Sequence, residues 1–232
     1  MSRKSKRNRP IQENQAPGKG WLRRSAILYA CAVALLLAVL LGSLLYKRGD
    51  SSSGNGNEQA ALASLQAPTL GDAGARVHIV EFMDPACETC AMFFPLVKQV
   101  MAENPGQIRL SVRQVAFHNG SDYVVRLLEA SRKQDKYWQT LEALLVSQSY
   151  WVPNHVVQPE LVDLAVGGLG LDMDRLAADM NSPEVIARVQ QDANDAITMK
   201  VTATPEYFVN GRPMPSFGTQ QLLTLINEEL QR

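Results

Sequence analysis

The sequence predicts an α/β domain that contains a long helical insertion and follows a single apolar helix. Three observations support this prediction. A strand pattern at 76–83 runs into a helical pattern at 88–103 and then into a second strand at 108–117. Helical patterns fill 121–200, and strand signals return at 202–214 before a last helix at 219–231. The first strand–helix–strand order, at this length, favours a parallel crossover.

An uncharged segment at 26–46 precedes the domain. It is long enough to cross roughly 30 Å of hydrocarbon and is longer than the apolar part of a typical cleaved signal peptide, which is the alternative. Eight basic residues stand before it against one acidic residue, Glu13. This asymmetry places the N-terminus in the cytoplasm. We therefore expect a basic cytoplasmic tail at 1–25, a single-pass transmembrane anchor at 26–46 in the bacterial inner membrane, and a periplasmic domain.

Residues 47–67 are rich in Ser, Gly and Asn and then in Ala, which predicts a flexible linker with a helical turn at 60–65. The folded domain is expected at 68–232. From residue 51 onward the chain has 21 acidic and 13 basic residues. Because nucleic-acid-binding domains carry a basic surface, no nucleic-acid partner is expected.

Two cysteines, Cys87 and Cys90, stand where the first strand passes into the helix. Backbone N–H groups at a helix N-terminus favour negative charge, so the Cys87 thiolate, the reactive form, should be stabilised. We expect Cys87 to be an exposed nucleophile and Cys90 a more buried thiol that resolves a mixed disulfide. A loop this short stabilises a fold little. The pair therefore predicts thiol–disulfide exchange.

Capping and turn signals define the later elements. Pro95 lies inside the helix at 88–103, which ends at 104–106. Ser121 and Asp122 are expected to cap the first helix of the insertion, and Pro183 to begin its last helix. The dipeptide at 210–211, Asn-Gly, predicts a hairpin turn.

These motifs together resemble the thioredoxin fold, and the insertion at about 121–200 resembles that of the DsbA-like, extracytoplasmic branch. The resemblance covers about 68–232 and rests on Cys87-Glu88-Thr89-Cys90 after the first strand and on Thr204-Pro205 before the hairpin. It implies a membrane-anchored protein thiol–disulfide oxidoreductase that needs no cofactor. It also implies that the protein acts on substrate proteins with cysteines and is served by a membrane redox partner protein.

The resemblance also implies roles for three further residues. Pro205 should be cis and lie against the cysteines, and Thr204 should present its backbone to an extended substrate. Glu81, six residues before Cys87, matches a buried acid that assists proton transfer at Cys90. The alternatives are that Pro205 simply opens a strand and that Glu81 is an exposed strand charge.

The direction of electron flow depends on the residues between the cysteines. Strongly oxidising relatives have a histidine there, whereas this chain has Glu88 and Thr89. A carboxylate beside Cys87 opposes thiolate formation, and Thr before the cis-proline is more typical of isomerase and reductase members. The sequence therefore favours a reductase or isomerase-like role. A DsbA-type protein disulfide oxidase is the alternative.

Two other classes of function remain open. Zinc would need ligands beyond the two cysteines, and His78, His118 and His155 have no paired spacing, so no metal site is expected. His78 should be an exposed strand residue. A non-catalytic, membrane-tethered binding or chaperone module could instead present an apolar surface at 150–152, although these residues are expected to pack the insertion onto the sheet.

Overall fold

The structure is a computed structural model that describes residues 34, 36–37, 39, 58–63 and 66–232. The chain divides into two units, Met1–Gly54 and Asn55–Arg232, and the second contains nearly all of the described residues. The expected tail at 1–25 and most of the anchor at 26–46 lie outside the described residues. Within the described part of the chain, no helix combines the length and the apolar character needed to cross a membrane.

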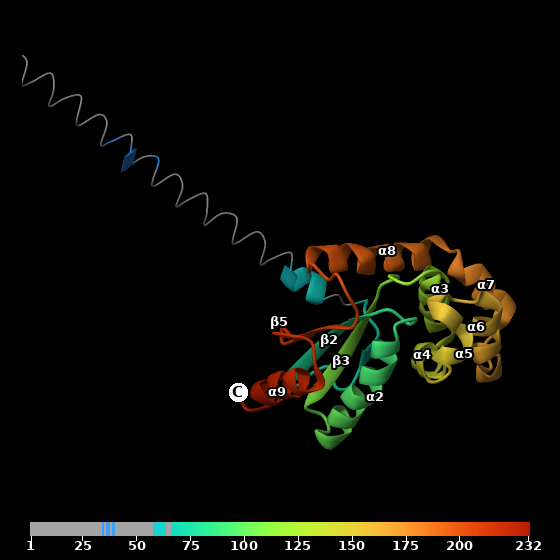
Figure 1. Cartoon of the computed structure of the whole chain (residues 1–232), viewed down its shortest axis with the longest axis horizontal. Helices are drawn as coiled ribbons and strands as arrows, with labels where there is room; N and C mark the ends of the chain where they lie inside the picture. Colours follow the sequence, from blue (N-terminus) through green and yellow to red (C-terminus); the bar gives the residue numbers. More distant parts are fainter. Residues whose placement is uncertain (1–33, 35, 38, 40–57, 64–65) are drawn as a thin grey trace, which may run out of the picture. The chain divides into compact units, whose positions relative to one another are not determined.

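A five-stranded sheet forms the centre of the second unit, in the order β1-β3-β2-β4-β5 (Figure 1). Strands β2 and β3 are parallel and the other pairs are antiparallel. The predicted parallel crossover is therefore confirmed, and α2 (Glu88–Glu103) is its helix. The strands are β1 (Thr69–Leu70), β2 (Val77–Met83), β3 (Ile108–Gln114), β4 (Glu206–Val209) and β5 (Arg212–Pro213).

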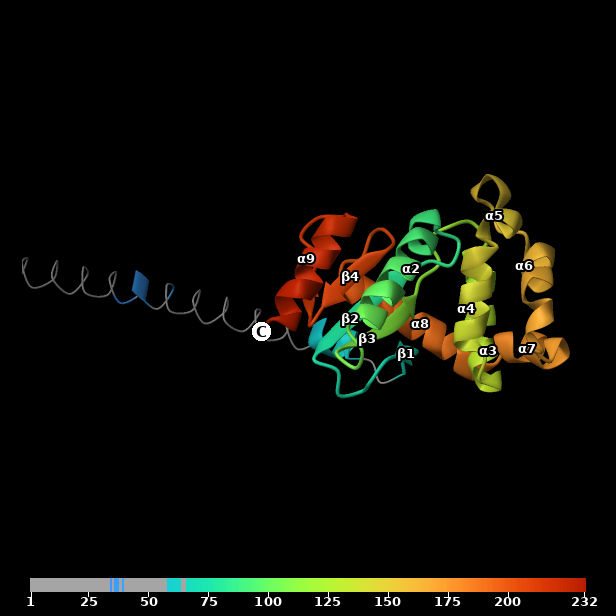
Figure 2. The same cartoon turned by 90° about the horizontal axis from the view of Figure 1, so that it is seen from below.

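The helical insertion lies between β3 and β4 in sequence, as predicted. Figures 1 and 2 show α3 to α7 packed together beside the sheet, and α8 returning along it. Its α-helices are α3 (Ser121–Ser131), α4 (Tyr137–Val146), α5 (Gln148–Trp151), α6 (Pro159–Val166), α7 (Met173–Met180) and α8 (Pro183–Thr198). Three short 3₁₀ helices join them: η1 (Arg132–Gln134), η2 (Pro153–His155) and η3 (Gly167–Leu169).

Two local expectations for this region are corrected. Strand β3 ends at Gln114 and not at Phe117, because the Phe117 N–H donates to the Asp84 side chain and not to a neighbouring strand. The N-cap of α3 is Gly120, at φ 81°, a left-handed conformation that glycine adopts readily. Ser121 is the first residue of the helix, and its hydroxyl donates a hydrogen bond to the Asp84 carboxylate.

The sheet separates two apolar clusters. Alternation along β2 turns Val77, Ile79 and Met83 toward a cluster that includes residues of α2 and α9 (Thr219–Leu230). Val80 and Phe82 point the other way, into a smaller cluster with Ala196 of α8. Glu81 therefore lies on the face of the sheet that α2 covers.

The smaller cluster is covered in part by residues 58–62, which are helical. Ala61 is buried, and its carbonyl accepts a hydrogen bond from the fully buried guanidinium of Arg113. Arg113 also pairs with Asp192 and Asp195 of α8, and Leu62 packs against the cluster. Part of the segment expected to be a linker thus belongs to the folded unit.

A chain that begins at Pro68 is therefore expected to be less stable than one that begins at Asn55. The shorter chain leaves a buried guanidinium donor without its acceptor, at about 1–3 kcal/mol, and loses the burial of Leu62, at about 1–2 kcal/mol. For a domain of this size the melting temperature should fall by about 5–15 °C, measured by circular dichroism. Within the full chain Leu62→Ala should lower it, and exposed Gln59→Ala should not. Equal melting temperatures for the two lengths would contradict this account.

Candidate active site

Cys87 stands at the start of α2 because Asp84 folds the chain between β2 and that helix. The Cys87 N–H donates to the Asp84 carbonyl at 3.0 Å, and the Ala86 N–H donates to Asp84 Oδ1 at 2.8 Å. Such turns, closed by an aspartate side chain, are common where a chain changes direction. Cys87 is the N-cap residue of α2 and has an extended backbone. Its sulfur therefore lies at the N-terminus of the helix.

Both thiols are free, and both are buried. The exposed fraction is 5% for Cys87 and 0% for Cys90. Cys90 is the more buried of the two, as predicted, but the expectation that Cys87 is exposed is wrong. The reason is a distant segment: Thr204 packs on Cys87, whose sulfur lies 3.3 Å from the Thr204 carbonyl oxygen.

The two thiols have opposite acidities. The pKa of Cys87 is lowered to about 5, first by the hydrogen bond from the Cys90 thiol and then by hydrogen bonds from the Thr204 side chain and from the backbone at Cys90 and Thr89, which together outweigh burial. Burial raises the pKa of Cys90 far above its ordinary value. At neutral pH the site therefore holds one thiolate and one protonated thiol. A nucleophile and a resolving thiol need this difference.

The Thr204–Pro205 peptide bond is cis, as predicted. Pro205 is buried, and Glu206, the next residue, begins β4 and pairs with Phe82 of β2. This pairing brings Thr204 to Cys87 across 117 positions of sequence. The contact between the cis-proline segment and the nucleophile is therefore present.

Glu81 is completely buried, so the alternative of an exposed strand charge is wrong. Its Oε1 accepts a hydrogen bond from the Tyr207 hydroxyl at 2.9 Å, and its Oε2 has no hydrogen-bond partner. Burial raises the pKa of Glu81 to about 8; the Tyr207 hydrogen bond opposes this rise and the charge of Cys87 adds to it. Glu81 is thus a carboxylic acid that can hold a proton at neutral pH.

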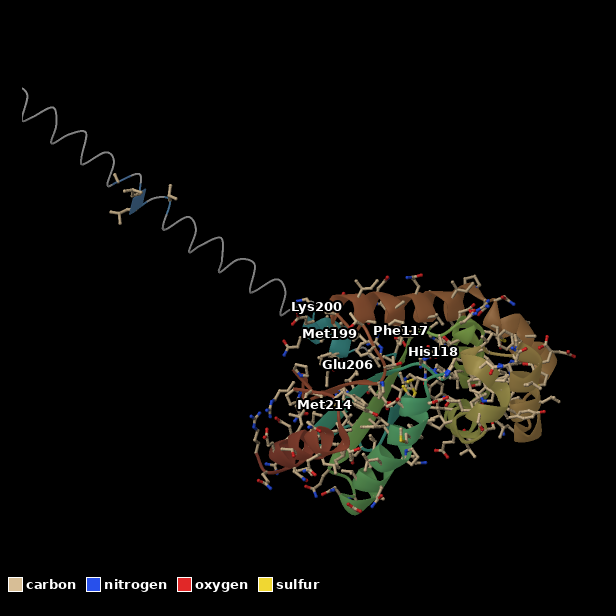
Figure 3. All side chains as sticks on the ribbon, viewed as in Figure 1. Phe117, His118, Met199, Lys200, Glu206 and Met214 are labelled. Carbon is tan, nitrogen blue, oxygen red and sulfur yellow. The ribbon has the colours of Figure 1, made fainter. Side chains whose placement is uncertain are left out.

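Two buried polar residues that support the site were not predicted. Asp84 Oδ2 accepts bonds from the N–H groups of Phe117 and His118, from His118 Nδ1 and from the Ser121 hydroxyl, at 2.6–3.0 Å. Gln148 of α5 donates to the carbonyls of Pro85 and Cys87, at 2.7 and 3.0 Å. Figure 3 places Phe117 and His118 in the loop between β3 and α3. The sequence Asp-Pro at the end of a strand could have indicated Asp84, but no local signal indicated Gln148.

A family model described as "Thioredoxin" matches residues 64–228. The chain belongs to this thioredoxin family. A probable disulfide bond formation protein D of Bacillus anthracis is 27% identical over 222 residues, which cover 91% of this chain and 100% of that protein. A thioredoxin-like oxidoreductase from Silicibacter pomeroyi has a TM-score of 0.64 at 26% identity, over 75% of this chain and 97% of that chain. These similarities confirm the DsbA-like branch of the thioredoxin family.

One relative is a much longer protein. The Na(+)/H(+) antiporter NhaA of Herminiimonas arsenicoxydans is 28% identical over 208 residues, which cover 86% of this chain but 32% of that protein. The present chain thus spans about a third of the length of that relative.

The remaining predicted residues surround the site or lie away from it. Glu88 is exposed, and its carboxylate lies 3.8 Å from His155 Nδ1. Thr89 is partly exposed. His78 is half-buried and not exposed as expected, because its Nε2 lies 2.8 Å from the Ser111 hydroxyl. Burial lowers the pKa of His78 to about 4, with a further contribution from the charge of Arg109.

The aromatic segment after α4 is buried only in part, and its buried tryptophan contacts another helix of the insertion. Trp151 is completely buried, and its indole N–H donates to the Leu144 carbonyl at 2.9 Å. Tyr150 stays exposed. The alternative function, a binding or chaperone module, requires an apolar surface at 150–152. Trp151, the largest side chain of that segment, is not on the surface. Among the described residues, no three His, Cys, Asp or Glu side chains are grouped so that they could hold a metal ion.

Proposed function

We propose that the protein is an extracytoplasmic protein thiol–disulfide oxidoreductase that gives its Cys87–Cys90 disulfide to substrate proteins. The low pKa of Cys87 beside a protonated Cys90 carries this proposal. Membership of the thioredoxin family and the similarity to relatives named for disulfide bond formation support the oxidoreductase activity. Thr204 and Pro205 are proposed as the platform that holds an extended segment of the substrate.

The reaction has two exchange steps. A substrate thiolate attacks the Cys87 sulfur, the Cys87–Cys90 bond breaks, and a mixed disulfide forms between substrate and Cys87 while Cys90 takes up a proton. A second substrate thiolate then attacks the substrate sulfur of the mixed disulfide, and Cys87 leaves as a thiolate. Because a thiol of low pKa is a good leaving group, the environment of Cys87 favours this second step.

The direction follows from the stability of the reduced form. Hydrogen bonds that stabilise the Cys87 thiolate stabilise the reduced protein, and this makes its disulfide more oxidising. A pKa of about 5 lies between the values of about 7 and about 3.5 found in a reducing and a strongly oxidising member of the superfamily. This argument favours the oxidase over the reductase or isomerase-like role. That role remains the second candidate, because the sequence has an acidic residue, Glu88, and no histidine directly after Cys87.

The proposed setting follows from the N-terminal sequence. The uncharged segment at 26–46 and the basic residues before it support a single-pass anchor in the bacterial inner membrane, with the domain in the periplasm. A disulfide donor must be reoxidised after each turnover. We therefore include a membrane redox partner protein, which accepts the two electrons, in the proposal.

The test is the equilibrium reduction potential of the chain from Asn55, measured against glutathione. We expect a value between about −120 and −200 mV, the range of oxidising members. A value below about −200 mV would overturn the oxidative direction in favour of the second candidate. The absence of any reversible two-electron couple would overturn both and favour the non-catalytic binding or chaperone module.

A matched pair of variants tests the influence of Glu88. Glu88→Gln removes the carboxylate of the residue after Cys87 and should raise the potential by about 5–15 mV, since a largely solvent-exposed charge contributes about 0.2–0.7 kcal/mol. Glu103→Gln, at the far end of α2, should leave the potential unchanged. A lower potential for Glu88→Gln would show that this carboxylate does not oppose the thiolate.

A further inference from the structure

Glu81 and Tyr207 face each other across the middle of the sheet. They are direct partners in the antiparallel pairing of β2 and β4, so their side chains project from the same face. Both are completely buried, and the Tyr207 hydroxyl donates to Glu81 Oε1 at 2.9 Å. On the other side of Glu81, its partner in β3 is the apolar Val112. Tyr207 is thus the hydrogen-bond partner of Glu81 within the described part of the chain.

The second oxygen of Glu81 is buried and has no hydrogen-bond partner. A buried polar atom without a partner costs free energy, so its presence in a folded protein calls for an explanation. An oxygen that binds and releases a proton during a reaction provides one. The nearby proton donor is Cys90, whose thiol is close enough for the charge of Glu81 to act on its pKa.

Tyr207 also contacts the helix that carries Cys90. Its ring stacks on Phe93, one turn after Cys90 in α2, with ring centroids 6.1 Å apart and an interplanar angle of 28°. Phe93 is covered in turn by Phe217, at 5.0 Å between centroids. The orientation of Tyr207 is therefore fixed both by α2 and by the pairing of β2 with β4.

We propose that Tyr207 is a positioning residue for proton transfer at Cys90: its hydroxyl holds Oε1 of Glu81, which leaves Oε2 as the atom that exchanges a proton with the Cys90 sulfur. This proposal rests on the proposed function. Oxygen Oε1, which accepts the hydrogen bond, is the carbonyl oxygen of the protonated acid. The proton is thereby confined to the oxygen that has no other partner.

The step balances without an external reagent. A substrate thiolate attacks the Cys87 sulfur, the Cys87–substrate bond forms and the Cys87–Cys90 bond breaks. Cys90 leaves with the electron pair and takes the proton from Glu81 Oε2, which leaves a Glu81 carboxylate. When the protein is reoxidised, Cys90 returns the proton to Oε2 before its sulfur attacks a mixed disulfide at Cys87.

The pH dependence of this step has a definite sign. Glu81 supplies the proton only while it is protonated, so the first step should slow as the pH rises through the pKa of Glu81, which burial raises. The titratable groups that act on Glu81 are Tyr207 from β4, Cys87 from the turn before α2 and Cys90 from α2. The Tyr207 hydrogen bond lowers this pKa. Removing the bond should therefore move the alkaline limb, the pH range over which the rate falls, to higher pH.

The test variant is Tyr207→Phe, which removes only the hydroxyl. The rate at which the oxidised protein, as the full chain, reacts with dithiothreitol is followed by stopped-flow fluorescence from pH 6 to pH 10. Comparing variants at equal pH cancels the ionisation of dithiothreitol. We expect the alkaline limb to move up by about half a pH unit or more and the rate at pH 7 to fall about threefold or more.

Tyr137→Phe is the matched control. Tyr137 lies in α4 and is also buried. Its hydroxyl accepts a hydrogen bond from Gln114 Nε2 at 2.8 Å and does not bond to Glu81. The substitution should cost similar stability and leave the pH profile in place. In a Glu81→Gln background the fall in rate at alkaline pH should be absent. Adding Tyr207→Phe to that background should not change the pH profile.

The possible outcomes separate this inference from the proposed function. A Tyr207→Phe profile that superimposes on the parent, an equal shift for Tyr137→Phe, or a limb that survives Glu81→Gln would each overturn the inference while exchange itself persists. A parent protein that does not react with dithiothreitol at all would overturn the proposed function. Tyr207→Phe and Tyr137→Phe are checked for equal melting temperatures, so that unfolding does not produce the shift.

Discussion

Replacing Cys90 by Ala is expected to turn the protein into a trap that holds its substrates as mixed disulfides. The Cys87 thiolate can still attack the disulfide of an oxidised substrate, which breaks that bond and releases one substrate thiolate, but no thiol remains at position 90 to displace the substrate from Cys87. Multiple-turnover exchange should fall to the uncatalysed rate. Covalent complexes should appear on non-reducing gels and disappear with dithiothreitol. Cys31, near the start of the expected anchor, is replaced by Ser in all variants so that it forms no complexes of its own.

The same variant should change the acidity of Cys87 in a stated direction. The Cys90 thiol makes the largest contribution to the low pKa of Cys87, so its loss should move the midpoint of iodoacetamide alkylation from about pH 5 to higher pH. Cys87→Ala is the control and should neither trap substrates nor react at low pH. Trapping by Cys87→Ala, or normal turnover by Cys90→Ala, would show that the roles of the two thiols are wrongly assigned.

Replacing Asp84 by Ala should produce the largest loss of stability among single substitutions around the site. Its carboxylate accepts five hydrogen bonds, from Ala86, Phe117, both donors of His118 and Ser121. Removing it leaves several buried donors unsatisfied, at about 1–3 kcal/mol each. We expect a total loss of roughly 3–5 kcal/mol, a large part of a typical domain stability. The measurement is the free energy of unfolding from urea titration.

Two milder variants make this prediction sharper. Asp84→Asn keeps one acceptor oxygen and should lose less than Asp84→Ala, and His118→Gln removes one donor and should lose least. The rate of Cys87 alkylation should also fall most in Asp84→Ala, less in Asp84→Asn and least in His118→Gln, because the Asp84 carboxylate closes the turn that presents Cys87. If Asp84→Ala unfolds at the same urea concentration as His118→Gln, the carboxylate is not the main support of this turn.

Local patterns in the sequence predicted much of the fold. The bounds of α2 agree with the predicted helix at 88–103, because helical spacing within one element needs no information from elsewhere. The cis-proline and the cysteine pair followed from motifs of two and four residues. The burial of Glu81 was implied by resemblance, since its spacing from Cys87 cannot reveal what covers it.

The missed features all depend on contacts between segments far apart in sequence. Cys87 is buried by Thr204, and Ala61 is held by Arg113. Gln148 reaches the active-site turn from 61 positions away. None of these polar or small residues forms a periodic pattern, so their partners could be found only in three dimensions. The half-burial of His78 has the same origin, because Ser111 belongs to another strand.

The amide of Gln148 makes the helical insertion part of the active-site turn. Here the carbonyls of Pro85 and Cys87 are held by a side chain of α5, so the turn before α2 is built jointly by the motif and the insertion. Transplanted into a host that lacks such an amide, Cys87-Glu88-Thr89-Cys90 would leave two buried carbonyls of this turn without their donor.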